Sequence, residues 1–458
     1  MSSATTLTNE LLQGTISGGF DADAMGAALA ELDRQPIDPL TKGFPAGHAA
    51  LPLGDIGAQG WNLLAGDLPA PVAVMRKSAL AHNARWMRHL LEKFGLQLAP
   101  HAKTTMTPHL WAQQAAHGSW GLTVATVQQA EVAAAFGCRN LLIANQVTGR
   151  AQVRGIVELT RTHDDLHLHA LVDSQAGLKA LSDDIAAAKT ERPINVLLEL
   201  GFKGGRTGCR TLEEIDALLD ELPSHQGRVR LAGMAGYEGQ IATPSGAEDG
   251  AGVEAYFDRF AEAVQLADRR NAFMTDQVIL TAGGSSYYDI VGRRLKQIAL
   301  RKPTVKILRS GCYVTHDCGT YVEHLEEMKR RDPAVAKDLG LLEPALFVCC
   351  LVQSIPEPGL ALLTMGKRDV GFDLHLPQPV WRHRAHATPQ PEPTPKDWKI
   401  TKLNDQHAYL NVPAKADIAV GDLICCGISH PCTTFDRWRL IHVVDDGWTS
   451  LGAVATFF

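Results

Sequence analysis

Apolar runs that alternate with amphipathic segments are the feature that most limits the fold of this chain. Between about residues 80 and 315, eight short apolar or β-branched runs are separated by segments whose apolar residues recur three or four apart. This alternation predicts a parallel sheet, and eight units favour a (β/α)8 barrel over an open doubly wound sheet. The expected strands are Leu96–His101, Gly121–Ala125, Asn140–Ala144, Leu166–Val172, Ile194–Leu200, Val229–Ala235, Gln277–Leu280 and Val305–Leu308. The clearest expected helices are Leu80–Phe94, Val127–Phe136, Leu212–Leu222 and Val253–Arg269.

The last quarter of the chain has a different pattern. After residue 340, short strands follow one another without helices, which predicts an antiparallel β domain. These strands are Ala345–Ser354, Gly359–Thr364, Ala408–Val412 and Asp422–Ile428. We expect Asp21–Leu32 to be a helix, Pro71–Arg76 to join the second sheet, and Leu376–Pro395 to be an exposed loop because it is rich in Pro, His and Arg. The predicted parts are an amino-terminal segment (1–78), a barrel (79–325) and a carboxyl-terminal β domain (326–458).

Composition and charge argue against several classes of function. A net charge of −6 gives no reason to expect nucleic acid or an anionic membrane as a partner. No run approaches the roughly 18 apolar residues of a membrane helix, and the first residues lack the features of a secretory signal. The adjacent pairs Cys349-Cys350 and Cys425-Cys426 are poorly placed to bridge within a pair, because neighbouring strand residues point to opposite faces. We therefore expect reduced thiols and a cytoplasmic protein.

Lys103 stands just past the first expected strand, in the run Pro100–Thr104. Chemistry in a barrel lies at the carboxyl ends of the strands, and a partly desolvated lysine forms Schiff bases well. A lone lysine at a barrel rim more often extends into solvent. The glycine turns Thr281–Tyr287 and Ser310–Tyr313, after the last two expected strands, change this balance because backbone N–H groups in such turns bind phosphate. Together these features indicate an aldehyde cofactor that carries a phosphate.

Ordered motifs make the chain resemble a known family over most of its length, from about Val72 to the carboxyl terminus. The motifs are Pro-His-Ala-Lys-Thr at 100–104, Gly-Gly-Arg-Thr-Gly at 204–208, Gly-Tyr-Glu-Gly at 236–239, Thr-Ala-Gly-Gly-Ser at 281–285, Ser-Gly-Cys-Tyr-Val at 310–314 and His-Pro-Cys at 430–432. They are similar to motifs of the D-serine dehydratase and D-threonine aldolase family of fold-type III pyridoxal phosphate enzymes. The resemblance implies an alanine-racemase-like barrel joined to a β domain, with the active site between them.

The resemblance also implies roles for individual residues. Lys103 would hold pyridoxal 5′-phosphate covalently, with His101 beside it. Arg206 would lie near the phenolic oxygen of the cofactor, and Tyr237 would approach the pyridine ring. The residues implied around the phosphate are Gly283, Gly284, Ser285, Gly311, Cys312 and Tyr313.

His430 and Cys432, two positions apart, are a candidate metal half-site. Zinc accepts imidazole nitrogen and thiolate sulfur, although an isolated His-x-Cys pattern is more often a core cysteine beside a surface histidine. The resemblance implies a divalent metal here, zinc or another cation such as manganese. It also favours dehydration, because the dehydratases resembled most closely use His and Cys where the aldolases tend to use His and Asp. His407 matches a further family motif, and no role is assigned to it.

The chain departs from the family pattern at a few positions near these motifs. Ala99, Thr105, Met106 and Gln240 stand where the family commonly has other residues. These differences leave the substrate open among D-serine, D-threonine and 3-hydroxyaspartate.

These observations together predict a lyase that depends on pyridoxal phosphate and a divalent metal and acts on D-configured β-hydroxy amino acids. Dehydration of D-serine or D-threonine to a 2-keto acid and ammonia is the first interpretation, and retro-aldol cleavage to glycine and an aldehyde is the alternative. Two alternatives of other classes are a non-catalytic pyridoxal phosphate-binding protein and a metal-dependent barrel hydrolase built on His167 and His169. We expect a small D-amino acid as the binding partner and a homodimer as the assembly.

Overall fold

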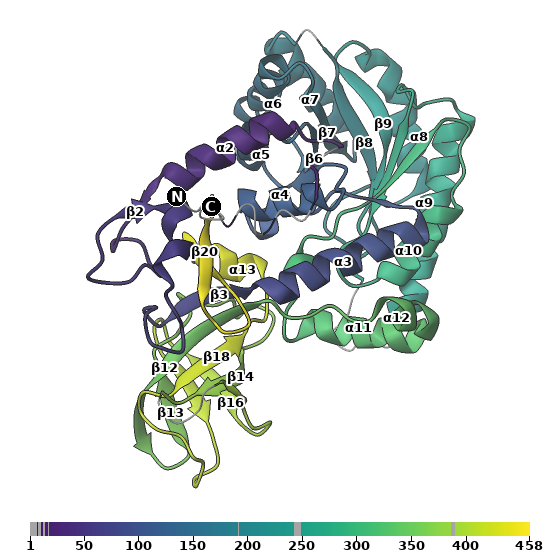
Figure 1. Ribbon diagram of the computed structural model, residues 1–458. Coiled ribbons are helices and arrows are strands. Elements are labelled where there is room, and N and C mark those ends of the chain that lie inside the picture. Colours follow the sequence, from purple (N-terminus) through teal and green to yellow (C-terminus); the bar gives the residue numbers. More distant parts are fainter. Residues whose placement is uncertain are drawn as a thin grey trace.

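The protein forms a parallel barrel that is joined to a mainly antiparallel sheet (Figure 1). The computed structural model describes residues 7, 11, 14–16, 18–190, 192–241, 249–385 and 390–458. Within this described part, eight parallel strands pair in the order β4-β11-β10-β9-β8-β7-β6-β5. They are β4 (Gln97–Leu98), β5 (Leu122–Val124), β6 (Asn140–Gln146), β7 (His167–Val172), β8 (Ile194–Leu200), β9 (Val229–Gly236), β10 (Val278–Ala282) and β11 (Thr304–Leu308).

The two outer strands of this order meet and close the barrel. His101, just past β4, forms a parallel bridge with Thr123 in β5, and the backbone N–H of Thr123 donates to the carbonyl of Pro100 at 3.0 Å. Apolar residues on or next to the strands form a separate small core that fills the inside, namely Ala99, Leu142, Leu171, Leu197, Ala232, Ala235, Ile279 and Ile307. A filled interior leaves the strand ends as the place for chemistry, and the predicted (β/α)8 barrel is confirmed.

Helices surround the barrel strands, as Figure 1 shows. They are α3 (Lys77–Phe94), α4 (Pro108–Ala116), α5 (Val127–Ala135), α6 (Arg150–Thr162), α7 (Gln175–Ala187), α8 (Leu212–Glu221), α9 (Asp249–Arg269) and α10 (Tyr288–Gln297), followed by α11 (Thr320–Arg331) and α12 (Pro333–Leu339). The four helices expected from apolar spacing correspond to α3, α5, α8 and α9. Short 3₁₀ turns are η1 (Leu53–Asp55), η2 (Gly57–Gln59), η3 (Ala102–Thr104), η4 (Leu222–His225) and η5 (Cys312–Val314).

The second sheet is built mostly from the carboxyl-terminal part of the chain. Its strands are β12 (Leu346–Glu357), β13 (Leu360–Leu363), β14 (Gln378–His383), β15 (Glu392–Pro393), β16 (Lys399–Leu403), β17 (Ala408–Asn411), β18 (Leu423–Gly427), β19 (Leu440–Val444) and β20 (Ser450–Ala455). A strand from before the barrel, β3 (Val72–Arg76), pairs antiparallel with β12 and parallel with β19. The prediction that Pro71–Arg76 joins this sheet is therefore confirmed.

The amino-terminal segment lies against both parts. Its helix α2 (Ala22–Arg34) begins where Asp21 accepts a hydrogen bond from the backbone N–H of Ala24 at 3.0 Å, so the expected helix is confirmed. The remaining short elements are β1 (Pro36–Ile37), β2 (Leu51–Pro52) and α13 (Cys432–Phe435).

The prediction that Leu376–Pro395 is an exposed loop is wrong for part of its length; residues 386–389 lie outside the described residues. β14 pairs antiparallel with β18, and the register shifts between Pro379 and Trp381. A proline is tolerated in a strand at such an irregularity because the missing N–H is not needed there. The Pro-rich composition therefore led to the prediction of a loop where the chain forms a strand.

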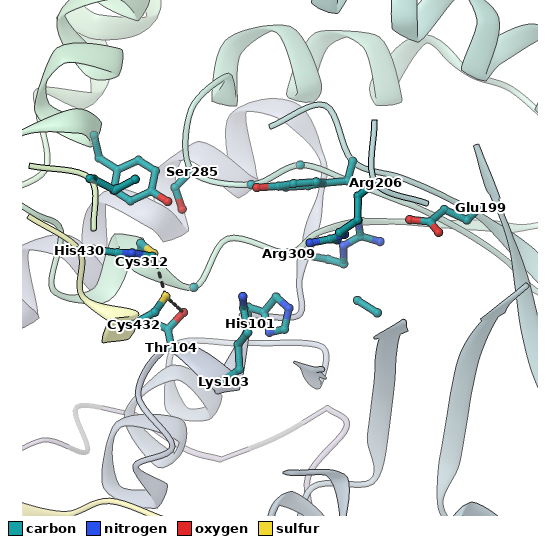
Figure 2. A pocket seen from close by; sticks show the side chains of 17 residues that line it. His101, Lys103, Thr104, Glu199, Arg206, Ser285, Arg309, Cys312, His430 and Cys432 are labelled. Carbon is teal, nitrogen blue, oxygen red and sulfur yellow. Dashed lines mark hydrogen bonds between the residues drawn. The ribbon is translucent and has the colours of Figure 1, made fainter. Parts of the chain in front are cut away.

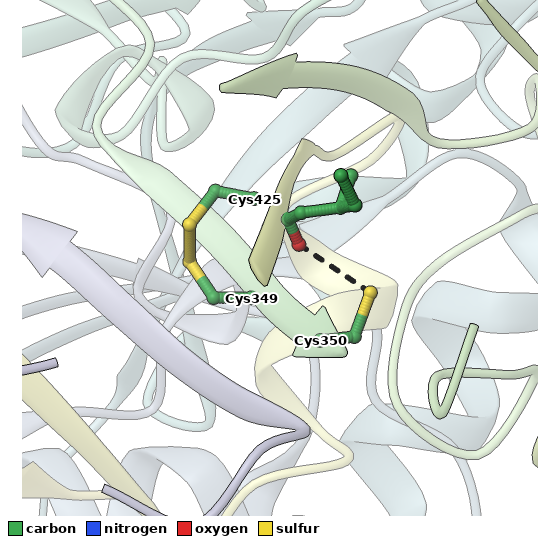
Figure 3. The surroundings of a disulfide bond; sticks show 4 residues. Cys349, Cys350 and Cys425 are labelled. Carbon is green, nitrogen blue, oxygen red and sulfur yellow. Dashed lines mark hydrogen bonds between the residues drawn. A yellow bond between two sulfur atoms is a disulfide. The ribbon is translucent and has the colours of Figure 1, made fainter. Parts of the chain in front are cut away.

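The expectation that the cysteines are reduced is wrong for Cys349 and Cys425, which form a disulfide (Figure 3). β12 and β18 place these two residues directly opposite each other, with Cα atoms 3.9 Å apart. The neighbouring residues Cys350 and Cys426 stay free, as expected for side chains on the other face of the sheet. The register between two distant strands, which the sequence does not reveal, decides this pairing.

A helix that crosses a bilayer needs a long, continuous apolar stretch. None of the described helices carries an apolar stretch that could cross one.

Candidate functional site

A cavity of about 270 Å³ opens where the carboxyl ends of the barrel strands meet the β domain (Figure 2). It is lined by His101, Lys103, Thr104, Ala144, Glu199, Arg206, Tyr237, Gly283, Gly284, Ser285, Arg309, Gly311, Cys312, Tyr321, Leu374, His430 and Cys432. Residues from both ends of the chain therefore share one chamber. Nearly all the predicted site residues belong to it.

Lys103 reaches the cavity from the 3₁₀ turn η3, which begins four positions after β4 ends. The same kind of turn, η5, follows β11, so two neighbouring strands end alike. The two turns touch, since a Cβ on Gly311 would lie 2.6 Å from both the carbonyl oxygen of His101 and Oγ1 of Thr104. Glycine is required at this position because the backbones approach too closely for a side chain.

Cationic groups gather on one side of Lys103 in Figure 2. Arg309 is buried and donates from Nη2 to the carbonyl of Gly236, while its buried Nη1 has no hydrogen-bond partner. Nδ1 of His101 is also buried and unpaired. Burial, together with the charges of Lys103 and Arg309, holds the pKa of His101 well below its usual value, so this imidazole is neutral. Two unpaired buried polar atoms facing one cavity indicate a polar ligand there.

Tyr237 and Arg206 form another wall of the cavity. The guanidinium of Arg206 lies 5.6 Å from the centre of the Tyr237 ring. Burial and the Glu238 carboxylate raise the pKa of Tyr237 to about 12, so its hydroxyl keeps the proton. On the same side of the cavity as Arg206 (Figure 2), Glu199 accepts a hydrogen bond from Nε2 of Gln146 at 2.6 Å.

The glycine turn after β10 is held by an acidic side chain. The buried carboxylate of Glu238 accepts from the backbone N–H of Gly283 at 3.0 Å and of Gly284 at 3.1 Å. These are two of the N–H groups expected to bind phosphate, and here they fix the shape of the turn. Contact of this turn with a phosphate stays a prediction.

Hydroxyl groups lie beside this turn. Ser310 Oγ is 2.7 Å from Ser285 Oγ and 2.9 Å from the hydroxyl of Tyr288, and all three residues are buried. Tyr313, predicted near the phosphate, is fully buried and bonds to Gln114. Tyr313 is not one of the described residues that line the cavity.

The predicted metal pair lies on the opposite side of the cavity from the arginines (Figure 2). Nδ1 of His430 donates to Oδ2 of Asp373 at 2.6 Å, and Sγ of Cys432 lies 3.7 Å from Sγ of Cys312. The thiol of Cys432 also donates to Oγ1 of Thr104 at 3.4 Å, which joins the β domain to the lysine turn.

Electrostatics distinguish the two members of the pair. Hydrogen bonds with Cys312 and His430 hold the pKa of Cys432 well below its usual value. Burial lowers the pKa of His430, but its bonds with Cys432 and Asp373 outweigh burial and raise that pKa to about 9. In the part of the chain that the structure describes, no three His, Cys, Asp or Glu side chains are grouped to hold a metal.

Two other sequence candidates lie elsewhere. His167 and His169 belong to β7, where His167 is exposed and His169 is buried with Nδ1 3.3 Å from the carbonyl of Leu141. Neither residue lines the cavity, and one is exposed while the other is buried, which gives no support to a hydrolase metal pair. His407 is not one of the described residues that line the cavity.

Sequence reasoning missed several cavity residues, namely Thr104, Ala144, Glu199, Arg309, Tyr321 and Leu374. Arg309 directly follows the last expected strand, so the rule that identified Lys103 could have found it. Glu199 is a charged residue inside the apolar run Ile194–Leu200, which is also a usable signal. Leu374 belongs to a loop of the β domain, and no pattern near it points to the barrel.

Comparisons with known proteins cover both parts of the chain. Residues 75–288 match the family model described as alanine racemase, N-terminal domain, and residues 345–444 match that described as putative serine dehydratase domain. The chain is 24% identical over 380 residues to a D-threonine aldolase from Arthrobacter sp., covering 82% of this chain and 89% of that protein.

A dehydratase is also similar. The chain is 30% identical over 182 residues to D-threo-3-hydroxyaspartate dehydratase from Delftia sp. (strain HT23), covering 39% of this chain and 46% of that protein. Among solved structures, D-threonine aldolase from Filomicrobium marinum superposes with a TM-score of 0.70 at 22% identity, covering 87% and 97% of the two chains. A cysteine-to-alanine mutant of a D-threo-3-hydroxyaspartate dehydratase, in the metal-free form, gives 0.66 at 20% identity, covering 87% and 99%.

Proposed function

Because the chain belongs to the D-serine dehydratase and D-threonine aldolase family of fold-type III pyridoxal phosphate proteins, we propose that it is a lyase for D-configured β-hydroxy amino acids. The preferred reaction is dehydration to a 2-keto acid and ammonia. The observation that carries the proposal is that Lys103 and the pair His430 and Cys432 line one cavity, although Cys432 and the lysine turn are 328 positions apart.

The cavity residues fit pyridoxal phosphate. Lys103 supplies an amine, and the unpaired buried atoms His101 Nδ1 and Arg309 Nη1 offer polar contacts to a ring substituent. The hydroxyl of Ser285, in the turn after β10, suits a phosphate, in the place where barrels usually bind one, and Ser310 holds this hydroxyl from behind. When bound, this cofactor supplies an aldehyde for the amine and a ring that takes up negative charge from the substrate α carbon.

Lys103 would remove the α proton of the bound amino acid. Its charge acts on His101, Cys312 and Cys432. The amine therefore lies between the arginine side of the cavity and the two thiols (Figure 2). From that position Nζ can remove the proton from the α carbon of a bound amino acid. Neutral His101 adds no further positive charge beside this amine.

The pair His430 and Cys432 fits one divalent cation with soft and borderline ligands. Asp373 holds the proton of His430 on Nδ1, which leaves Nε2 as the ring nitrogen for a ligand bond. Two protein ligands leave the other positions for substrate and water. When bound, the metal supplies a Lewis acid that makes the β-hydroxyl a better leaving group.

Cys432 supports dehydration over aldol cleavage. A related dehydratase has been crystallised as a cysteine-to-alanine mutant in the metal-free form, and this chain has a cysteine in its candidate metal pair. The alternative, cleavage to glycine and an aldehyde, is favoured by the similarity to a D-threonine aldolase over 82% of the chain.

Product analysis tests the proposal. The purified protein, supplied with pyridoxal phosphate and zinc or manganese, is incubated with D-serine, D-threonine and D-threo-3-hydroxyaspartate. We expect a 2-keto acid and ammonia in equal amounts, and the L-isomers serve as controls. Glycine with an aldehyde would establish the aldolase alternative, and bound cofactor without turnover would establish a binding protein. The homodimer and the cytoplasmic location stay predictions.

A further inference from the structure

Two thiols face each other on one side of the cavity, and the proposed reaction uses only one of them. Sγ of Cys312 and Sγ of Cys432 are 3.7 Å apart, and both residues line the chamber (Figure 2). Cys312 follows β11 of the barrel, whereas Cys432 begins α13 in the β domain. A disulfide needs the two sulfurs at about 2.05 Å, so they would have to approach each other by about 1.7 Å.

The other free cysteines of the described residues are placed differently. Cys138 and Cys209 are buried, and their thiols donate to the carbonyls of Asn140 at 3.3 Å and Asp173 at 3.1 Å. Cys350 and Cys426 are fully buried inside the second sheet, and half-buried Cys318 does not line the cavity. Among the described cysteines, Cys312 and Cys432 alone line the cavity. They are therefore the thiols that a small solute in the cavity meets first.

We propose that Cys312 and Cys432 form an oxidation site in which a hydroperoxide closes a disulfide across the candidate active site. Half-buried Cys432 reacts first, and its thiol with hydrogen peroxide gives a sulfenic acid and water. The thiol of Cys312 then attacks the sulfenic sulfur, so that the S–S bond forms and a second water leaves. Two thiols lose two electrons in total, and one peroxide gains them.

The disulfide removes Cys432 from the candidate metal pair. A sulfur shared with Cys312 is no longer a thiolate, which is the form that binds zinc. The bond also ties the η5 turn of the barrel to α13 of the β domain. This consequence rests on the proposed function, whereas formation of the bond does not.

Peptide mapping of the full chain tests the proposal without any substrate. The protein is freed of metal by a chelator, treated with hydrogen peroxide, blocked with N-ethylmaleimide and digested without reduction by trypsin and a protease that cuts before aspartate. Cleavage before Asp317 leaves Cys312 alone in a peptide spanning 310–316, separate from Cys318. Cys432 falls in a peptide spanning 422–435, which the Cys349–Cys425 disulfide keeps joined to the peptide that holds Cys349. Tandem spectra distinguish a new bond at Cys432 from the existing bond at Cys425 and from Cys426.

We expect the species that joins peptide 310–316 to peptide 422–435 through Cys432, with the Cys349 peptide still attached at Cys425, to rise about tenfold over the untreated protein and to vanish after reduction. In Cys312→Ser the cross-link should be lost while Cys432 accumulates sulfenic or sulfinic acid. The matched variant Cys318→Ser should retain the cross-link. Oxidation of Cys432 without a link to Cys312 in the wild type, or no oxidation of either, would overturn the proposal. Since the readout is a mass, a chain without lyase activity can still pass this test.

Zinc gives a second readout. Protein loaded with zinc before peroxide should form the cross-link more slowly than metal-free protein, because the metal occupies the Cys432 sulfur. Equal rates with a full cross-link would leave the oxidation site intact and contradict the metal assignment in the proposed function. The two inferences therefore fail separately.

Discussion

Nδ1 of His430 lies 2.6 Å from Oδ2 of Asp373, and this contact ties the candidate metal pair to the loop between β13 and β14. The same carboxylate accepts from Oγ1 of Thr433 through Oδ1 at 2.7 Å, so both of its oxygens are engaged. A carboxylate in this position fixes the tautomer and the orientation of a ligating imidazole.

We predict that Asp373→Asn weakens metal binding by roughly ten- to a hundredfold, because the amide cannot hold the proton on Nδ1 as a carboxylate does. Equilibrium dialysis against zinc measures the dissociation constant without any need for turnover. Asp405→Asn, an exposed carboxylate of the same domain 4.0 Å from Arg368, is the matched control and should leave the constant unchanged. Equal zinc affinity in Asp373→Asn and the wild type would refute the role of this contact.

Lys103→Ala is predicted to abolish covalent attachment of the cofactor. Borohydride reduction of the wild type with pyridoxal phosphate should add one pyridoxyl group per chain, located by peptide mapping at residue 103. The variant should carry none at any single site, because its cavity offers no other primary amine among the described residues that line it. Lys306→Ala removes another barrel lysine, whose Nζ donates to the carbonyl of Lys296, and should still be labelled. A fully labelled Lys103→Ala protein would show that another lysine holds the cofactor.

Arg309→Lys is predicted to weaken cofactor binding by roughly tenfold or more. The guanidinium donates to Gly236 with one nitrogen and leaves Nη1 for a ligand, whereas a lysine has a single nitrogen for both tasks. Losing a charged hydrogen bond costs about 1.5–3 kcal/mol. Fluorescence titration with pyridoxal phosphate measures the effect. Arg230→Lys, which alters an arginine bonded to Asn195 in the barrel wall, should bind the cofactor as the wild type does.

The barrel was predictable because its signals are local. Apolar runs such as Ile194–Leu200 end where the strands end, and the residues that follow them, Lys103 and Tyr237, reach the cavity for that reason alone. The position of a side chain at a strand end needs only the strand and the parallel topology.

The other features of the fold and the site could not be predicted, because they depend on contacts between segments that are distant in the sequence. Nothing near Asp373 in the sequence points to His430, and the glycine turn gives no sign that Glu238 occupies two of its N–H groups. The pairing of Cys349 with Cys425 follows from the register of β12 against β18, which tertiary packing decides. Such contacts leave no periodic pattern in the sequence, so they cannot be predicted from the sequence alone.

The buried His442 should make stability depend on pH. Its Nε2 donates to the carbonyl of Gly43, Nδ1 contacts the hydroxyl of Ser450, and burial lowers its pKa from 6.5 to about 4. Below pH 6.5 the unfolded chain takes up a proton that the folded chain refuses, so stability falls as the pH falls, down to about pH 4. For a shift of this size the loss is on the order of 3 kcal/mol. Urea unfolding between pH 7 and 4 should show a shallower decline in His442→Gln, whereas exposed His167→Gln should decline as the wild type does. Parallel declines for His442→Gln and the wild type would contradict a neutral His442 in the fold.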